Sequence, residues 1–89
     1  MKPYHIVVAP AALRHLEAIA EPHRTRVRAA ITALANQPRG RGTVKMTSQN
    51  LYRIRVGVYR VIYAIHDNIV TIVITEVGHR SQIYRNLPK

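Results

Sequence analysis

The stretch that most constrains this chain is "LYRIRVGVYRVIY", residues 51–63, because apolar and basic side chains alternate along it. Successive side chains of a strand point to opposite faces, so this alternation predicts a β-hairpin with one apolar and one basic face. Gly57 and Val58 suit a two-residue turn between the strands, since a type II′ turn takes glycine at its first central position. The turn therefore predicts the register in which the two strands pair.

That register sorts the hairpin side chains by face, because cross-strand partners point the same way. It pairs Val56 with Tyr59, Arg55 with Arg60, Ile54 with Val61 and Arg53 with Ile62. The apolar face then holds Tyr52, Ile54, Val56, Tyr59, Val61, Tyr63 and Ile65. The opposite face holds Arg53, Arg55 and Arg60. A slip of one residue would turn the arginines into the core, so the pattern supports this one register.

The rest of the chain divides into a strand at residues 4–8, two helical segments, a basic loop with room for a short edge strand at 43–46, and three strands at 51–56, 59–66 and 69–77. The first helix begins at Pro10, and the second lies within residues 24–38. Their predicted buried stripes are Leu13, Leu16, Ile19 and Ala20 in the first, and Val27, Ala30, Ile31 and Leu34 in the second.

The order strand, helix, helix, strand, strand, strand predicts an α+β fold in one domain over residues 1–89. In that fold a helical hairpin packs on one face of a twisted, mostly antiparallel sheet.

Charge is the strongest composition signal. Fourteen Lys and Arg residues stand against four acids, for a net charge of +10 and a pI near 11.2. The acids are Glu17, Glu21, Asp67 and Glu76, so residues 22–66 contain none. Such a surface attracts polyanions, although a basic surface can also serve solubility alone.

Other classes of site are disfavoured. The absence of cysteine excludes disulfides, zinc–thiolate sites and thiol nucleophiles. His5, His15, His23 and His66 are scattered, so we expect no metal site. No apolar run approaches the roughly 20 residues of a membrane span, and the N-terminus makes a poor signal peptide. We expect a cytoplasmic protein without a membrane role.

The three hairpin arginines allow two interpretations. Arg55 and Arg60 repel each other when directly opposed, and no acid nearby in sequence relieves this. The arginines are then either harmless on a solvated edge, or they converge on an anion such as a phosphate. Because Ile62 and Ala64 accompany them, the pattern favours a partly shielded anion site.

The hairpin "LYRIRVGVYRVIY", an apolar strand and then "VGHRSQIYR" together resemble the RelE-type toxins of the bacterial RelE/ParE toxin–antitoxin superfamily. The resemblance covers nearly the whole chain. It implies a RelE-like, microbial ribonuclease-type fold. It also implies a ribosome-dependent endoribonuclease that cleaves mRNA in the ribosomal A site and so inhibits translation. The implied partners are mRNA, the ribosome and a RelB-like, acidic antitoxin, with no metal or small-molecule cofactor.

The resemblance also implies a catalytic set. The motif places it at Arg53, Arg55, Arg60, Arg80 and Tyr84. The arginines would stabilise the charged phosphorane that forms when the 2′-hydroxyl attacks. Arginine hardly loses its proton, so His79 is the better candidate for proton transfer. His79 and Tyr84 each have a structural alternative, in which the side chain only packs.

The other basic residues suggest a surface for docking ribosomal RNA. They are Arg24, Arg26, Arg28, Arg39, Arg41 and Lys45. Alternatively, this surface contacts only the antitoxin. Two further functions remain open on the same fold: a ParE-like gyrase inhibitor, and a non-catalytic member that binds antitoxin or nucleic acid. The catalytic set that the resemblance implies is complete in this sequence. This favours RNA cleavage, because the ParE-like gyrase inhibitors generally lack the full basic set.

Overall fold

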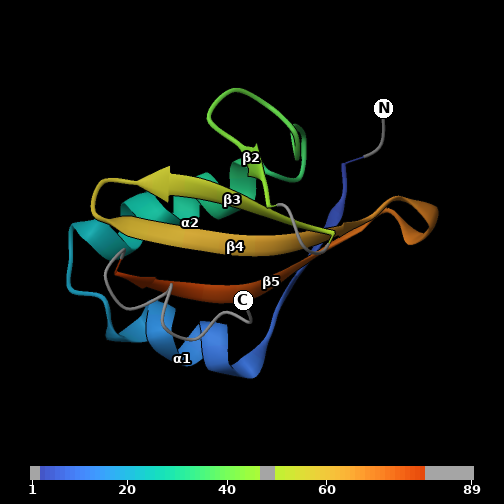
Figure 1. The fold of residues 1–89 in the computed structure, drawn as a ribbon. Coiled ribbons are helices and arrows are strands. Elements are labelled where there is room, and N and C mark those ends of the chain that lie inside the picture. The colour runs from blue at the N-terminus through green and yellow to red at the C-terminus, as the bar shows by residue number, and fades with distance from the viewer. Residues whose placement is uncertain (1–2, 47–49, 80–89) are drawn as a thin grey trace.

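The computed structural model describes residues 3–46 and 50–79, and within them two helices pack on a five-stranded sheet (Figure 1). Strand β1 (His5–Val8) leads into helix α1 (Pro10–Ala18), which has proline in its first turn as predicted. Helix α2 (His23–Ala33) follows. The α+β fold is confirmed, with both helices on the same face of the sheet.

The sheet is ordered β1-β5-β4-β3-β2. Strand β2 (Val44–Lys45) is the short edge strand expected near residues 43–46, and β3 (Leu51–Val56) pairs with it. Strand β4 (Tyr59–His66) and strand β5 (Thr71–His79) flank a single 3₁₀ turn, Asp67–Ile69. All neighbouring strands are antiparallel except β1 and β5, which are parallel. Parallel strands need a long crossover connection, and here that connection includes both helices.

The predicted register of the β3–β4 hairpin is confirmed. Val56 lies opposite Tyr59, and Arg55 lies opposite Arg60, with each earlier pair following in step. Gly57 has φ +61°, in the region that side-chain-bearing residues avoid. Glycine therefore makes the tight turn available, and the turn fixes which side chains share a face.

The core lies between the sheet and the helices. All seven residues of the predicted apolar face either lie in this core or pack against it. Val27, Ile31 and Leu34 of the second predicted stripe are buried, and Ala30 is partly buried.

The stripe predicted for α1 was partly wrong. Leu16 and Ile19 are buried, but Leu13 is 41% exposed and Ala20 is also exposed. Ala12 is buried instead. Ala12 and Leu16 lie four positions apart on one side of α1, and Ile19 is the residue that caps its C-terminal end. A nine-residue helix that touches the sheet along one side buries only that line.

Helix α1 also covers the half of β5 that β1 does not reach. Strand β1 pairs only with residues 71–74 of β5. Beyond them, the Glu76 carboxylate accepts a hydrogen bond from the Val77 N–H at 3.2 Å and lies 2.8 Å from Nδ1 of His15 in α1. This contact fastens the helix to the edge of the strand.

Within the described residues, no helix is long and apolar enough to cross a membrane.

Replacing Gly57 by alanine tests the turn. A Cβ at this position would meet no atom within 4 Å, so any loss of stability comes from the backbone conformation. We expect Gly57→Ala to lower the free energy of unfolding by about 1–2 kcal/mol, measured by urea denaturation. The neighbouring Val58→Ala, at an exposed turn position, should change it by less than about 0.5 kcal/mol. Equal stability of the two variants would contradict the assigned turn.

Candidate functional site

Three arginines share the outer face of the sheet, which is the face turned away from α1 and α2. Arg55 lies directly opposite Arg60, and Arg53 lies opposite Ile62. Their exposure differs sharply, because Arg60 is only 7% exposed whereas Arg55 is exposed and Arg53 intermediate. Arg60 is therefore not a solvent-exposed arginine at a sheet edge, which was the alternative to an anion site. The site combines a largely buried arginine on β4 with an exposed arginine opposite it on β3.

His79 does not lie with these arginines. It pairs with Tyr59, whereas Arg60 pairs with Gly78. Tyr59 packs against the core on the helix side, and its ring centroid lies 6.0 Å from that of His79 and 5.8 Å from that of His23. The structure thus places the His79 ring in an aromatic group next to the start of α2. The proposed proton-transfer role of His79 stays a prediction, and the register puts its ring on the opposite face from Arg60.

Two other predicted site residues, Arg80 and Tyr84, lie outside the described residues. Their catalytic roles also stay predictions. Among residues 3–46 and 50–79, no three His, Asp or Glu side chains gather in a way that could hold a metal ion.

The residues predicted to dock RNA do not form one uniform surface. Arg26, Arg28, Arg41 and Lys45 are exposed, and none has an ion pair among the described residues. Arg24 is partly occupied, because it contacts the Glu21 carboxylate at 3.2 Å and the Glu17 carbonyl at 3.3 Å. Four of the six predicted residues therefore present free charge to a partner.

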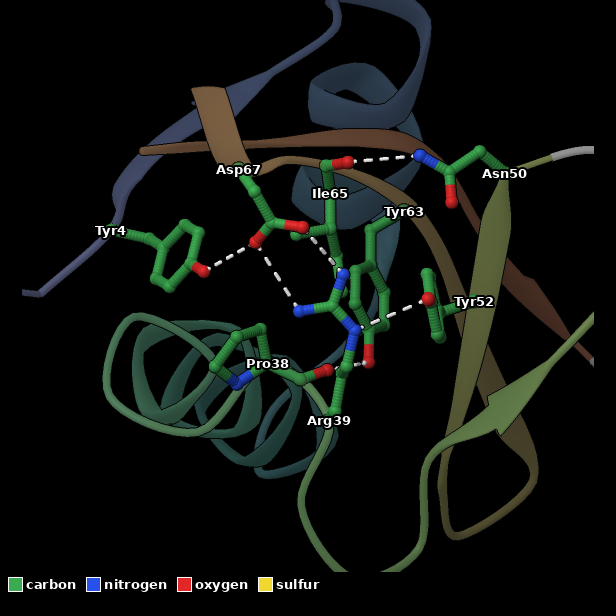
Figure 2. A network of polar contacts seen from close by, with 8 residues as sticks. All are labelled: Tyr4, Pro38, Arg39, Asn50, Tyr52, Tyr63, Ile65 and Asp67. Atoms are coloured by element: carbon green, nitrogen blue, oxygen red, sulfur yellow. Dashed lines mark hydrogen bonds and ion pairs between the residues drawn. The ribbon is translucent and has the colours of Figure 1, made fainter. Parts of the chain in front are cut away.

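Arg39 has an internal role that the sequence analysis missed (Figure 2). Its guanidinium donates to both oxygens of Asp67, at 2.8 and 3.3 Å. Its Nε donates to the Tyr52 hydroxyl at 3.2 Å, and the charge lies 5.4 Å from the centre of that ring. Such a two-pronged pair holds the loop after α2 against the turn between β4 and β5. Asp67 is an isolated acid in a basic region, and this was the signal that could have revealed the pair.

The same end of the sheet carries further hydrogen bonds around Arg39. Tyr4, just before β1, donates to Asp67 at 2.6 Å. The Tyr63 hydroxyl donates to the Pro38 carbonyl at 2.8 Å, and burial raises the pKa of Tyr63 to about 12. These contacts join four segments that are distant in sequence, and they close the sheet at the end opposite the Gly57 turn.

The charges of this network shift the pKa of its members. The hydrogen bonds from Arg39 and then Tyr4 hold the pKa of the Asp67 carboxyl below its usual value. The hydrogen bond to Asp67 in turn raises the pKa of Tyr4. A lowered carboxyl pKa means that Asp67 stabilises the fold above its unfolded-state pKa, near 3.9. That stabilisation is lost as the pH falls through the lower pKa of the folded state.

Comparison with known proteins identifies the family. The family model described as the ParE toxin of the type II toxin–antitoxin system, parDE, matches residues 6–84. The chain belongs to this family. The sequence resemblance to the RelE/ParE superfamily is thereby confirmed, and the protein is a toxin of the type II toxin–antitoxin class. A search of curated proteins found no match.

Solved structures of RelE toxins share the fold of this toxin. The RelBE2 toxin–antitoxin complex of Mycobacterium tuberculosis matches with 28% identity and a TM-score of 0.77, over 88% of this chain and 99% of that one. The RelB–RelE complex of Methanococcus jannaschii matches with 26% identity and a TM-score of 0.73, over 92% and 99% of the two chains. The RelE–RelB complex of Pyrococcus horikoshii matches with 24% identity and a TM-score of 0.79, over 90% and 98%.

Removing the Asp67 charge tests the network. Asp67→Asn keeps the side-chain shape but loses the ion pair with Arg39, so its thermal unfolding midpoint should fall below that of the wild type at pH 7. The difference should shrink as the pH drops below about 4, where the wild-type carboxyl also takes up a proton.

The matched control is Glu17→Gln, which removes one exposed acid whose carboxylate makes no hydrogen bond within residues 3–46 and 50–79. This variant should unfold close to the wild-type midpoint. A pH-independent difference for Asp67→Asn would contradict the role given to the carboxylate.

Proposed function

We propose that this toxin is a ribosome-dependent endoribonuclease that cleaves mRNA in the ribosomal A site and so inhibits translation. The observation that carries the proposal is the pairing of the buried Arg60 with the exposed Arg55 on the outer face of the sheet. Two positive side chains directly opposite each other on a sheet repel, and a phosphate bound by both would relieve that repulsion. If the toxin cleaves mRNA, this phosphate belongs to the RNA substrate.

The chemistry follows from what guanidinium groups can and cannot do. When the RNA 2′-hydroxyl attacks the neighbouring phosphorus, negative charge grows on the oxygens of the phosphorane. Arg60, with Arg53 or Arg55, would hold that charge, and one such donor is worth about 3–4 kcal/mol. The products would be a 2′,3′-cyclic phosphate and a 5′-hydroxyl, so RNA without the 2′-hydroxyl would not be cut.

Proton transfer falls to other groups in this proposal. Arginine holds its proton at any pH at which the fold survives, so the three arginines cannot serve as the general base. His79 remains the proposed residue for proton transfer and Tyr84 a candidate proton donor, while Arg80 belongs with the arginines proposed to hold the phosphate. The strand register places His79 on the opposite face of the sheet from Arg60. The ribosome itself can supply a group that these residues do not.

The proposed partners are the ribosome with its mRNA, and a RelB-like antitoxin. Two of the solved relatives above 25% identity are toxins in complex with RelB antitoxins. A toxin with a net charge of +10 would attract both ribosomal RNA and an acidic antitoxin by the same long-range field. For docking RNA we retain Arg24, Arg26, Arg28, Arg41 and Lys45. We expect Arg39 to contribute less to RNA docking, because its guanidinium already forms an ion pair with Asp67.

A second function has one observation in its favour. The family model that matches this chain is that of the ParE toxins, and ParE-like inhibition of gyrase uses the same fold. A gyrase inhibitor would cause DNA breaks and an SOS response while leaving mRNA uncut. The arginine pair on the outer face favours RNA cleavage, because gyrase inhibition does not require it.

Mapping mRNA 5′ ends after induction distinguishes the two functions. Induction of the wild type should arrest growth and leave cuts in phase with codons, only in transcripts that carry a translation start site. Arg60→Ala should lower cleavage by about 10²–10³-fold through loss of one phosphorane donor.

Because Arg60 is buried, circular dichroism should accompany that variant, and the exposed Arg55→Ala provides a second test of the site. The charge-matched control Arg14→Ala, on the exposed side of α1, should cleave like the wild type. Growth arrest with intact mRNA would rule out the ribonuclease, and DNA breaks with an SOS response would support the gyrase alternative.

A further inference from the structure

The register of the sheet places one carboxylate, that of Glu76 in β5, on the same face as the three arginines. Glu76 pairs with Ile62 of β4, and Ile62 pairs in turn with Arg53 of β3. Cross-strand partners point to the same face, so Glu76 shares the outer face with Arg53. The next row along this face holds Arg60 and Arg55. Glu76 is therefore a diagonal neighbour of Arg60.

A bulge in β5 brings this carboxylate to the outer face. The register between β4 and β5 shifts after Ile62, so that Thr75 is an extra residue in β5, and its hydroxyl donates to the Ile62 carbonyl at 3.1 Å. Strict alternation from the buried Ile74 would have put Glu76 in the core. With the extra residue, Val77 is fully buried and Glu76 faces outwards. Bulges that redirect a side chain in this way are common beside active sites.

The other three acids of the chain lie elsewhere. Glu17 is on α1, Glu21 lies just before α2, and Asp67 is bound to Arg39 at the other end of the sheet. Since all four acids of the sequence are among the described residues, Glu76 is the only carboxylate on the arginine face. Arginine cannot accept a proton, so a proton acceptor on this face has to be another kind of residue.

The Glu76 carboxylate is held by one of its two oxygens. Oε1 accepts a hydrogen bond from the Val77 N–H at 3.2 Å and lies 2.8 Å from Nδ1 of His15. His15 reaches it from α1, which lies along β5 (Figure 1). Oε2 makes no hydrogen bond within residues 3–46 and 50–79. The side chain is 19% exposed, so the carboxylate is oriented by its neighbours and still has an oxygen that can take a proton.

We propose that Glu76 is the general base of the RNA cleavage proposed above, and that His15 is a positioning residue that holds its carboxylate. The inference rests on that proposed function. It gives the accepting half of the proton transfer to a residue on the arginine face, whereas His79 lies on the opposite face. Carboxylates serve this role in many enzymes, and a positioned base contributes about 10²–10⁴-fold to the rate.

In the proposed step, Glu76 takes the proton of the RNA 2′-hydroxyl, and the 2′-oxygen forms a bond to the neighbouring phosphorus. Arg60 and Arg55 hold the charge of the phosphorane. The bond from phosphorus to the 5′-oxygen then breaks, and this oxygen takes up a proton from water. Glu76 finally releases its own proton, which neutralises the hydroxide left behind.

The test measures single-turnover cleavage of mRNA on programmed ribosomes, with the whole toxin in excess. Glu76→Gln keeps an oxygen for the Val77 N–H but cannot accept a proton. Its rate at saturating toxin should fall about 10²–10⁴-fold, while the toxin concentration that gives half the maximal rate stays within about twofold. Glu76→Asp keeps a carboxylate and should retain more activity. The matched control Glu17→Gln, which loses an acid on α1, should cleave like the wild type.

Variants of His15 separate the base from a contact that only fastens α1. His15→Ala and Glu76→Gln disturb the same contact, so a purely structural role predicts similar losses in the two variants. The proposal predicts unequal losses, with His15→Ala only about tenfold slower at saturating toxin. His15→Asn carries an amide nitrogen close to the position of Nδ1 and should recover most of that loss. Circular dichroism at the assay temperature gives the folded fraction of each variant.

A substrate with sulfur in place of the 5′-oxygen distinguishes a proton acceptor from a donor. A thiolate leaves without taking up a proton, so a variant that lacks the donor is rescued on this substrate. Glu76→Gln should stay slow, because its defect lies at the 2′-hydroxyl. Rescue of Glu76→Gln would make Glu76 the donor and overturn the proposal.

Two further results would overturn it: cleavage by Glu76→Gln within about threefold of the wild type, or equal losses in Glu76→Gln and His15→Ala. Both leave the ribonuclease function standing, because the wild type cleaves in the same assay. If the wild type leaves ribosome-bound mRNA intact, the ribonuclease function itself fails, and the role of Glu76 as its base fails with it.

Discussion

The structure depends most on the register of the β3–β4 hairpin. Gly57 at φ +61° closes the turn, and from that point the period of two sends every tyrosine, valine and isoleucine of the predicted face towards the helices. The same step sends Arg53, Arg55 and Arg60 to the other face. The core and the candidate anion site are thus produced by one constraint, and a shift of one residue would destroy both.

The two ends of the sheet are held in different ways. At the turn end, the rings of His23, Tyr59 and His79 pack beside the start of α2. At the other end, Arg39 and Asp67 hold the loop after α2, the β4–β5 turn and the residue before β1 together (Figure 2). Ion pairs at exposed sites contribute little singly, but this bidentate pair, with the hydrogen bonds to Tyr4 and Tyr52, restrains four separate segments at once.

Acidic residues are scarce, and the fold uses them internally. Of the four, Glu21, Asp67 and Glu76 each pair with a basic side chain of the same chain. Little negative charge is left to neutralise the remaining arginines, among them the exposed arginines of α2 and Arg55 of β3. The positive field that would draw a polyanion or an acidic partner is therefore a property of the surface as well as of the composition.

The sequence by itself determined the α+β fold, the hairpin register and the face on which the three arginines lie, because local alternation and turn chemistry specify all of them. It also carried the family resemblance. Only the tertiary structure decided that Arg60 is buried, that His79 joins Tyr59 on the helix side, and that Asp67 holds Arg39. These outcomes depend on which segments meet across the sheet, and contacts between residues far apart in the chain, such as Arg39 and Asp67 at 28 positions, leave no periodic signal in the sequence.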